Sequence, residues 1–409
     1  MSRTRSEPGS GVGGQNEDSA IIAQALPDLS ALTKPGAEGD PALDLALQKA
    51  DQLRQADQPE VAIALLRETV ARWPDSPTAW GRLAVALYKT NQHEASIQPY
   101  FRWLDLQDNP VVRGALVAAL FKCGQLEQAR IQRELCLEAW DRAAVKIRAA
   151  PEFAAYRLKE GGRGFDPENR ARNIISFSLW GDRPEYVTGA IVNAQISRYV
   201  YPGWTARFYC DPNVPADARE ALRFYGAQTI VMKRPEDAQI RMMWRFLASD
   251  DPNINVFLVR DTDSRLNAQE LLAVQDWLKS GKRFHTMRDH LLHSGPMMGG
   301  MWGGYAGVLP NLKDWIHAST DYYGERFVDQ FFLWDKLWPL VRDDVRAHDS
   351  LGTFHGSVPF PEGFRLPADH HIGGGVKTMP HWSQYYARSA PGRGASAPEP
   401  PAPQPEPQA

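Results

Sequence analysis

Residues 41–150 repeat themselves at a short, regular interval. Ala62, Ala95 and Ala129 follow one another after 33 and 34 residues, and each comes shortly after a turn-like stretch. A small residue at such an interval lets two helices approach closely, and the larger apolar residues one turn away can pack between them. Helix pairs of this kind bury their apolar faces only against neighbouring pairs. The sequence therefore predicts a stacked helical array.

The repeat unit is clearest at Trp80–Leu87, which reads WGRLAVAL, and the turn over residues 73–77 reads WPDSP. Leu83 recurs 33 residues later as Leu116. With these residues the segment resembles a tetratricopeptide repeat array of about three degenerate units. The resemblance implies either a concave groove that holds a partner protein or a domain that packs on the next one and stiffens it. The sequence leaves both roles open.

The composition of the two ends differs from that of the centre. The chain has 409 residues, enough for two or three domains. Residues 1–40 are rich in Gly and polar residues, and residues 389–409 carry seven prolines, which predicts a disordered arm and an extended Pro-rich tail. No apolar run is long enough for a signal peptide or a membrane span. We therefore expect a cytoplasmic protein without a transmembrane segment.

Charge and cysteine content exclude several classes of protein. The 46 Lys and Arg nearly balance the 49 Asp and Glu, which gives a net charge of −3. Such a chain has no basic field to attract nucleic acid, so we expect no nucleic-acid partner. The three cysteines are too few and too scattered for a disulfide scaffold, and none forms a C-x-x-C zinc pair. A reducing compartment fits this content.

Aromatic residues concentrate in residues 173–388, where nine of the 13 Trp lie, so this region can bury a large core. It follows a linker over residues 151–172. Short apolar runs alternate here with helical patterns, which predicts an α/β domain with a largely parallel sheet. The predicted fold class is thus α plus α/β, with helical repeats before the α/β domain. The expected strands cover residues 173–179, 205–210, 228–232 and 254–260, and one expected helix covers residues 239–248.

Two acidic residues follow the apolar strand 254–260 directly. Asp261 and Asp263 form the D-x-D of the chain, and alternate residues of an extended backbone project to the same side. Two carboxylates at this position suit Mg²⁺ or Mn²⁺, which oxygen ligands and substrate phosphates hold together. The alternative is a cap on the helix that starts near Leu266. A buried strand that runs straight into two acids favours the metal site.

This arrangement resembles the GT-A class of nucleotide-sugar glycosyltransferases, in which a D-x-D sits at the end of a central strand. The resemblance implies a GT-A fold and metal ligands at Asp261 and Asp263. The segment from His371 to Lys377 matches the pattern H-x-x-G-x-x-K, with which some members supply a third metal ligand and a lysine that binds the diphosphate. His348, at another expected strand end, is the rival third ligand.

Further residues resemble the donor-binding parts of that class. Asp329 and Gln330 resemble an Asp-Gln pair near the sugar, and Trp302, in a Gly-rich strand and turn, could stack on a sugar ring. Ser178, near the end of the first strand, is a candidate donor contact. Arg245 is equally a diphosphate or nucleotide contact or a surface charge on its helix.

The implied reaction moves a sugar from a nucleotide-sugar donor to a hydroxyl of a glycan, lipid-linked or protein acceptor. If the configuration inverts, a carboxylate must deprotonate the acceptor, and Asp289 and Asp329 are the candidates.

His290 and His293 are either site residues or solvent-facing loop residues. The alternatives are a repeat-containing interaction scaffold with an inactive transferase-like domain and a metal-dependent phosphoesterase. Trp334 and Trp338 are expected in the core.

Overall fold

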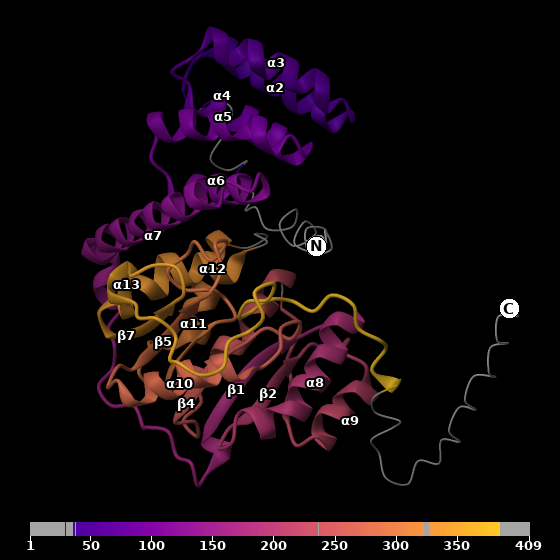
Figure 1. Cartoon of the computed structure of the whole chain (residues 1–409), viewed down its shortest axis with the longest axis vertical. Coiled ribbons are helices and arrows are strands. Elements are labelled where there is room, and N and C mark those ends of the chain that lie inside the picture. The colour runs from indigo at the N-terminus through magenta and orange to yellow at the C-terminus, as the bar shows by residue number, and fades with distance from the viewer. Residues whose placement is uncertain (1–28, 30–35, 37, 236, 323–326, 385–409) are drawn as a thin grey trace, which may run out of the picture.

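The computed structural model describes residues 29, 36, 38–235, 237–322 and 327–384 (Figure 1). The expected tail over residues 389–409 and most of the expected arm over residues 1–40 lie outside the described residues. A helical array comes first along the chain, and a domain built on a mixed sheet follows it. No helix in the described ranges is long and apolar enough to cross a membrane.

The array consists of helices packed as antiparallel pairs along the chain, and each contacts the next. The turns inside the three pairs contain Asp57, Asn91 and Gly124, all with positive φ, at intervals of 34 and 33 residues. The repeat is therefore present in the backbone as well as in the sequence. The helices are α2 (Pro41–Gln55), α3 (Pro59–Arg72), α4 (Pro77–Lys89), α5 (His93–Leu106), α6 (Pro110–Lys122) and α7 (Leu126–Ala149).

The repeated alanines differ in their burial. Ala62 and Ala129 are buried, as the helix-pair interpretation predicts, but Ala95 is exposed. Ser96 is buried in its place. The second repeat is therefore shifted by one residue, and the small side chain at the helix contact is a serine.

The described part of the second domain forms a seven-stranded sheet in the order β3-β2-β1-β4-β6-β5-β7. Only β6 runs antiparallel to its neighbours in this sheet, so the expectation of a largely parallel sheet is confirmed. β4 lies at the centre of the order. The strands are β1 (Asn173–Leu179), β2 (Thr205–Cys210), β3 (Gln228–Val231), β4 (Val256–Val259), β5 (Phe284–Arg288), β6 (Trp302–Tyr305) and β7 (Val345–Asp349).

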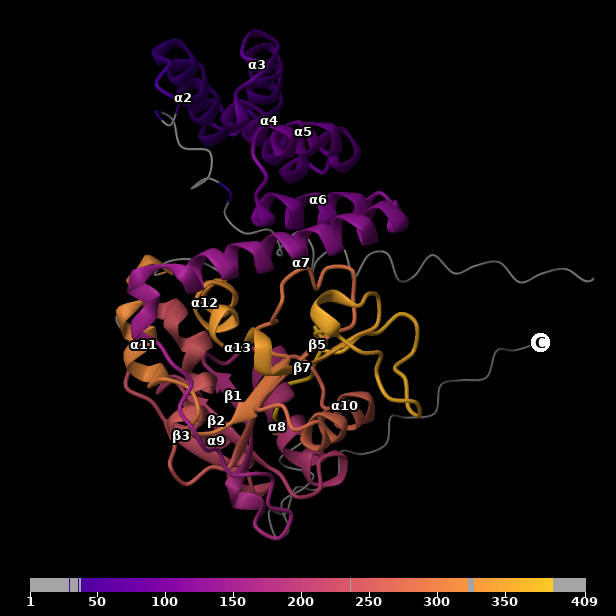
Figure 2. The ribbon, with the colours of Figure 1, turned by 90° about the vertical axis from the view of Figure 1, so that its left-hand side faces the viewer.

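Helices cover both faces of the sheet. One apolar cluster packs the strands against α8 (Pro184–Val200), α9 (Ala216–Phe224) and α10 (Ala268–Lys279). The cluster on the other face includes α11 (Leu312–Ala318), α12 (Val328–Phe332) and α13 (Trp338–Val341), and also Leu137 and Ala144 of α7. The last helix of the array therefore belongs to the core of the sheet domain, and α7 lies across that domain in Figure 2.

The helix expected over residues 239–248 is present, and it is a 3₁₀ helix, η4 (Ala238–Asp250). Two hydroxyls of β1 compete for its backbone groups. The Ser176 hydroxyl donates to the carbonyl oxygen of Arg245, and the amide of Arg245 donates to Ser178 Oγ at 3.0 Å. Hydrogen bonds that leave the helix in this way favour a tighter helix than the α form, and a pattern of apolar residues does not encode them.

Asp141 of α7 joins the array to the sheet domain. Its Oδ1 accepts from Trp338 Nε1 and Arg342 Nε, both at 2.9 Å, and its Oδ2 accepts from Arg342 Nη2 at 2.6 Å. Partial burial acts to raise the pKa of Asp141, but the hydrogen bonds from Arg342 and Trp338 outweigh it, so the pKa is lowered.

We expect Asp141→Asn to lower the free energy of unfolding by about 1–3 kcal/mol at pH 7, because hydrogen bonds to a charged acceptor are lost. A lowered native pKa stabilises the fold above the unfolded pKa of about 3.9, and this contribution disappears as the pH falls through the native value. Urea unfolding at pH 7 and at pH 3.5 measures both effects. The control Asp105→Asn changes an exposed carboxylate. Equal stability of the two variants would refute the role of Asp141.

Candidate functional site

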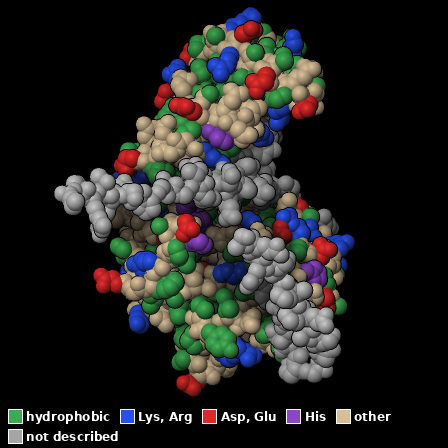
Figure 3. All heavy atoms as spheres, turned by 45° about the vertical axis from the view of Figure 1, so that its right-hand side comes forward, with side chains coloured by type: hydrophobic (Ala, Val, Ile, Leu, Met, Phe, Trp, Pro, Cys, Tyr) green, Lys and Arg blue, Asp and Glu red, His purple; other side chains and the backbone are tan. Residues whose placement is uncertain are grey.

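The edge of the sheet where the parallel strands end faces a cavity of about 630 Å³. From β1 the chain adds β2 and β3 on one side of the sheet, and it then returns to add β4 and the later strands on the other side. Ligands of open α/β sheets bind at the point where the strand order reverses in this way, here between β1 and β4. Trp180 follows β1 and Asp261 and Asp263 follow the end of β4, and all three line the cavity. The opposite wall comes from α6 and α7. Figure 3 shows the waist between the array and the sheet domain, where acidic, basic and His side chains gather.

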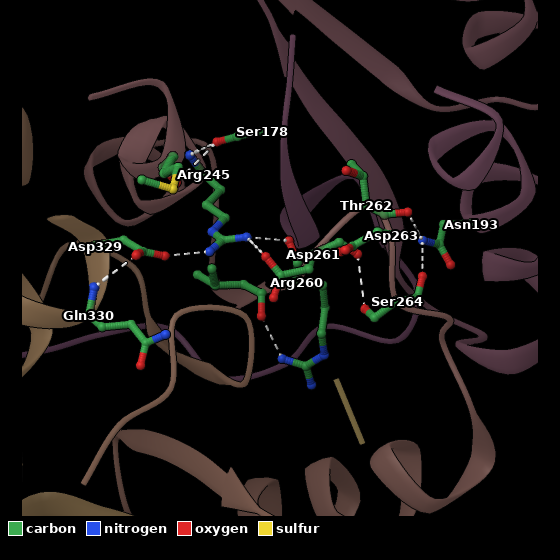
Figure 4. Close-up of polar contacts among 12 residues, drawn as sticks. Ser178, Asn193, Arg245, Arg260, Asp261, Thr262, Asp263, Ser264, Asp329 and Gln330 are labelled. Atoms are coloured by element: carbon green, nitrogen blue, oxygen red, sulfur yellow. Dashed lines mark hydrogen bonds and ion pairs between the residues drawn. The ribbon is translucent and has the colours of Figure 1, made fainter. Parts of the chain in front are cut away.

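Arg245 of η4 joins two carboxylates at the floor of the cavity. Its Nη1 pairs with Asp261 Oδ1, and its Nη2 donates to Asp329 Oδ2 at 2.8 Å (Figure 4). The side chains of Arg245 and Asp329 are 7% and 8% exposed, so water cannot replace this pairing. Burial raises the pKa of Asp329, against the opposing effect of Arg245. Of the two interpretations of Arg245, the surface charge is wrong.

Two consecutive glycines allow the loop before β6 to approach these carboxylates. A Cβ added to Gly299 would clash with the carboxylate of Asp329, and one added to Gly300 would clash with that of Asp261. A side chain at either position would therefore displace the carboxylates from Arg245. The Gly-rich sequence before β6 reflects this close packing.

Asp263 pairs with a different cation. Its Oδ2 accepts from Lys377 Nζ at 2.8 Å, and its side chain is 18% exposed. Burial acts to lower the pKa of Lys377, but the charge of Asp263 outweighs it and raises the pKa. The loop that carries Lys377 is fixed to the D-x-D segment by the amide of Val376, which donates to the carbonyl oxygen of Asp263 at 2.7 Å.

Three histidines, His290, His293 and His371, line the same cavity. The rings of His290 and His371 stack with centroids 4.4 Å apart, and His293 meets His371 edge-on at 5.1 Å. Burial and the neighbouring His371 and Arg133 lower the pKa of His290 to about 3, and burial holds the pKa of His293 well below its usual range. The alternative that both are solvent-facing loop residues is wrong.

The structure brings most of the predicted site residues to the cavity: Ser178, Arg245, Asp261, Asp263, Asp329, Gln330, His371 and Lys377 all line it. The hydroxyl of Ser178 is hydrogen-bonded within the protein: it accepts from the backbone amide of Arg245 and donates to the carbonyl oxygen of Met242 at 3.3 Å. The backbone N–H of Gln330 donates to Asp329 Oδ1 at 2.9 Å.

Two predicted residues lie elsewhere. His348 is fully buried on β7, where its Nδ1 lies 3.2 Å from His285 Nε2 and its Nε2 lies 3.2 Å from Asp276 Oδ2, so it is not placed with the D-x-D. Trp302 is also fully buried, with its ring edge-on to Phe246 and Phe257. The prediction that Trp302 stacks on a sugar is therefore wrong, because the core encloses its ring.

Asp289 does not line the cavity either. Its Oδ2 accepts from Gln269 Nε2 at 3.1 Å and from the amide of Ile372 at 3.2 Å, and its Oδ1 accepts from the hydroxyl of Ser350. The contact with Ile372 fixes the segment that carries His371, and the other two contacts join Asp289 to α10 and to the loop after β7. This placement does not support a role for Asp289 as a base.

Several cavity residues were missed by the sequence reasoning. Trp180 and Tyr186 form a pair with ring centroids 6.5 Å apart and planes within 21°. Trp334, which was expected in the core with Trp338, lines the cavity next to Trp140 of α7, with centroids 4.6 Å apart. The position of Trp180 directly after the first strand could have identified it. No sequence signal could have placed Trp140 there, because it belongs to the array.

The residues around Asp261 and Asp263 determine whether this end of the cavity can hold a divalent cation. The described ranges contain no group of three or more His, Cys, Asp and Glu side chains that could hold one metal ion. Asp263 is accessible and carries a cationic partner, Lys377, while Asp261 is bound to Arg245. Such residues do not enclose a metal on their own. They fit Mg²⁺ or Mn²⁺, which one or two carboxylates commonly hold together with substrate phosphates.

Comparisons with known proteins agree with the helical part. A tetratricopeptide repeat family model matches residues 47–109, which confirms the predicted repeat type there. Among solved structures, a mutant of the Thermobaculum terrenum O-GlcNAc transferase is similar at 13% identity with a TM-score of 0.25. The similarity covers 54% of this chain and 50% of that chain, so it spans about half of that protein. No curated protein matches. At this TM-score the likeness does not define the fold of the sheet domain.

Proposed function

We propose that the chain is a glycosyltransferase of the GT-A type, which moves a sugar from a nucleoside diphosphate donor to a hydroxyl acceptor. One observation carries the proposal: the D-x-D follows the central strand, beside the point where the sheet reverses its connections, and opens into the cavity. The cavity volume of about 630 Å³ lies within the range of small-molecule sites.

The cavity offers complementary groups for each part of such a donor. The pair Trp180 and Tyr186, after β1, presents flat aromatic surface for a nucleobase. Lys377 and Asp263 lie next along the sheet edge and suit a diphosphate with its counter-ion. A divalent cation held by Asp263 and Asp261 together with the donor phosphates would neutralise charge on the departing diphosphate. Within the described residues His371 does not form a three-ligand group with these two carboxylates, so the phosphates and not His371 would complete the site.

The residues of the chain have separable roles in this proposal. Lys377 supplies a fixed positive charge for the phosphates, which costs no reorganisation during the reaction. Arg245 holds Asp261 and Asp329 in place, and Gln330 lines the cavity beside Asp329. Asp329 is the one of the two base candidates that lines the cavity, so it would accept the acceptor proton if the configuration inverts.

Thermal unfolding with UDP, GDP and their sugars, with and without Mn²⁺, tests the proposal. Because no group of side chains in the described ranges could enclose a metal by itself, we expect a small shift with Mn²⁺ alone and a large one with Mn²⁺ and the right nucleotide. A ligand present at 100 times its Kd raises the free energy of unfolding of the protein by about 2.7 kcal/mol. Asp263→Asn should remove the metal-dependent part of the shift. Asp314→Asn, an exposed change on α11, should retain it.

The outcomes separate the three functional classes. Absence of a metal-dependent shift across the whole donor panel would refute the transferase and favour an interaction scaffold with an inactive domain. Metal-dependent hydrolysis of p-nitrophenyl phosphate without any nucleotide shift would favour the phosphoesterase. A shift that survives Asp263→Asn would show that the nucleotide binds elsewhere.

A further inference from the structure

The cavity has a second end, away from the switch point between β1 and β4. Its walls are the loop that follows β5 and the helical array. One face of α6 contributes Pro110, Val111, Gly114 and Ala118, and Trp140 and Trp334 lie alongside. The D-x-D and the Trp180 pair occupy the β1–β4 end, so this second end is the space left for the acceptor.

The array holds the loop at this end in place. Leu291 and Leu292 pack against the apolar core of the array, and the Phe121 ring lies 5.1 Å from the His290 ring. Arg133 of α7, fully buried, donates from Nε to the carbonyl oxygen of His293 at 3.1 Å. The position of this loop in the cavity therefore depends on α6 and α7.

Hydrogen bonds fix the tautomers of the two loop histidines. The amide of Leu292 donates to His290 Nδ1 at 3.2 Å, and the amide of Asp289 donates to His293 Nδ1 at 2.9 Å. A nitrogen that accepts a hydrogen bond carries no hydrogen, so each ring is neutral and carries its hydrogen on Nε2. Neither Nε2 has a hydrogen bond to a residue within the described part of the chain. Both residues line the cavity, and in these tautomers each ring has one N–H group, at Nε2, with which it can donate to a ligand.

The charges around the cavity indicate what these donors bind. The cations Arg245 and Lys377 lie at the β1–β4 end and are already paired with carboxylates. The second end combines the two neutral N–H donors with apolar and aromatic side chains. Trp334 is held rigidly there, because its Nε1 donates to the carbonyl oxygen of Met297 at 2.7 Å. Neutral donors beside flat aromatic surface suit a ligand that has hydroxyl oxygens, apolar C–H faces and no charge.

We propose that this second end is an acceptor subsite for a neutral saccharide, that the Nε2–H groups of His290 and His293 bind its hydroxyl oxygens, and that the helical array completes the subsite. The assignment of this saccharide as the acceptor rests on the proposed function, because only the transfer reaction defines an acceptor. Saccharide binding itself can be measured without any donor.

Two substitutions of His293 separate binding from folding. The amide oxygen of His293→Asn can take the place of Nδ1 and accept from the amide of Asp289, but no donor remains at the Nε2 position. His293→Gln can restore a donor near Nε2 while it loses the Nδ1 acceptor. The matched control is His317→Asn, which changes an exposed histidine on α11.

Saturation-transfer NMR on the full chain, with the methyl glycosides of glucose, galactose, mannose and N-acetylglucosamine as probes, measures the binding. We expect one or more probes to bind the wild-type protein. His293→Asn should weaken that binding about tenfold, which corresponds to about one hydrogen bond. Its melting temperature and its nucleotide shift should stay unchanged. His293→Gln should be less stable but bind more tightly than His293→Asn.

Each outcome has a separate meaning. If nucleotide binds but no methyl glycoside does, the inference fails and the proposed function stands. If Ser- and Thr-containing peptides bind in place of the glycosides, the acceptor is a protein and the inference fails. If glycosides bind with the His293 dependence but no nucleotide does, the saccharide site stands and the transferase fails. Equal glycoside binding by His293→Asn and His317→Asn would overturn the assignment of His293.

Discussion

Replacing Arg245 by methionine is expected to lower the free energy of unfolding by about 3–5 kcal/mol at neutral pH. Methionine fills much of the same space, but Asp261 and Asp329 lose their shared cation. Asp329 is 8% exposed, and removing one partner of a buried ion pair leaves an uncompensated charge that water cannot reach. Urea unfolding measures the loss. A change below about 1 kcal/mol, the level of an exposed pair, would contradict the structural role of this bridge.

The pH dependence of the same variant gives an internal check. Burial already raises the pKa of Asp329, and without Arg245 the pKa should rise further. A raised native pKa stabilises the fold below the unfolded pKa of about 3.9, and this stabilisation is lost as the pH rises through the native value. The stability deficit of Arg245→Met should therefore shrink between pH 7 and pH 4. Adding Asp329→Asn should recover part of the deficit at pH 7, because the uncompensated charge is then gone.

Asp349 lies at the junction of the array and the sheet domain, and Asp349→Asn is expected to lower the free energy of unfolding by about 3–5 kcal/mol. Asp349 Oδ2 accepts from Arg133 Nη2 at 2.8 Å and from Arg288 Nε at 2.7 Å, and all three side chains are fully buried. The isosteric asparagine would leave two buried guanidinium groups without their carboxylate. Arg133 also holds the loop at His293, so the variant should loosen the contact between the array and the cavity.

Calorimetry and limited proteolysis of Asp349→Asn measure this loss. We expect a lower melting temperature and faster cleavage near residues 289–296. Burial acts to raise the pKa of Asp349, but Arg288 and Arg133 outweigh it and lower the pKa, so its contribution is present above about pH 4 and is lost at lower pH. The control Asp343→Asn breaks an exposed pair with Arg148 and should cost at most about 1 kcal/mol. Equal losses in the two variants would show that the buried pairs do not stabilise the junction.

Local patterns in the sequence determined the element types of this protein. The interval between Ala62 and Ala129 predicted the helical repeat, because helix pairs are made by contacts between residues close in the chain. The alternation of apolar runs and helical patterns predicted most strands of the sheet. The position of Asp261 and Asp263 after β4 placed them at the ligand-binding edge, since the carboxyl ends of parallel strands meet there.

Tertiary structure alone decided which side chains reach the cavity. Both faces of the sheet are covered, so apolarity does not indicate which way Trp302 or His348 points; both are fully buried, and neither lines the cavity. Arg245 was ambiguous because its two partners, Asp261 and Asp329, lie 16 and 84 residues away along the chain. The sequence by itself therefore determined the elements and the acidic motif, whereas contacts between distant segments decided that the helical array forms one wall of the site.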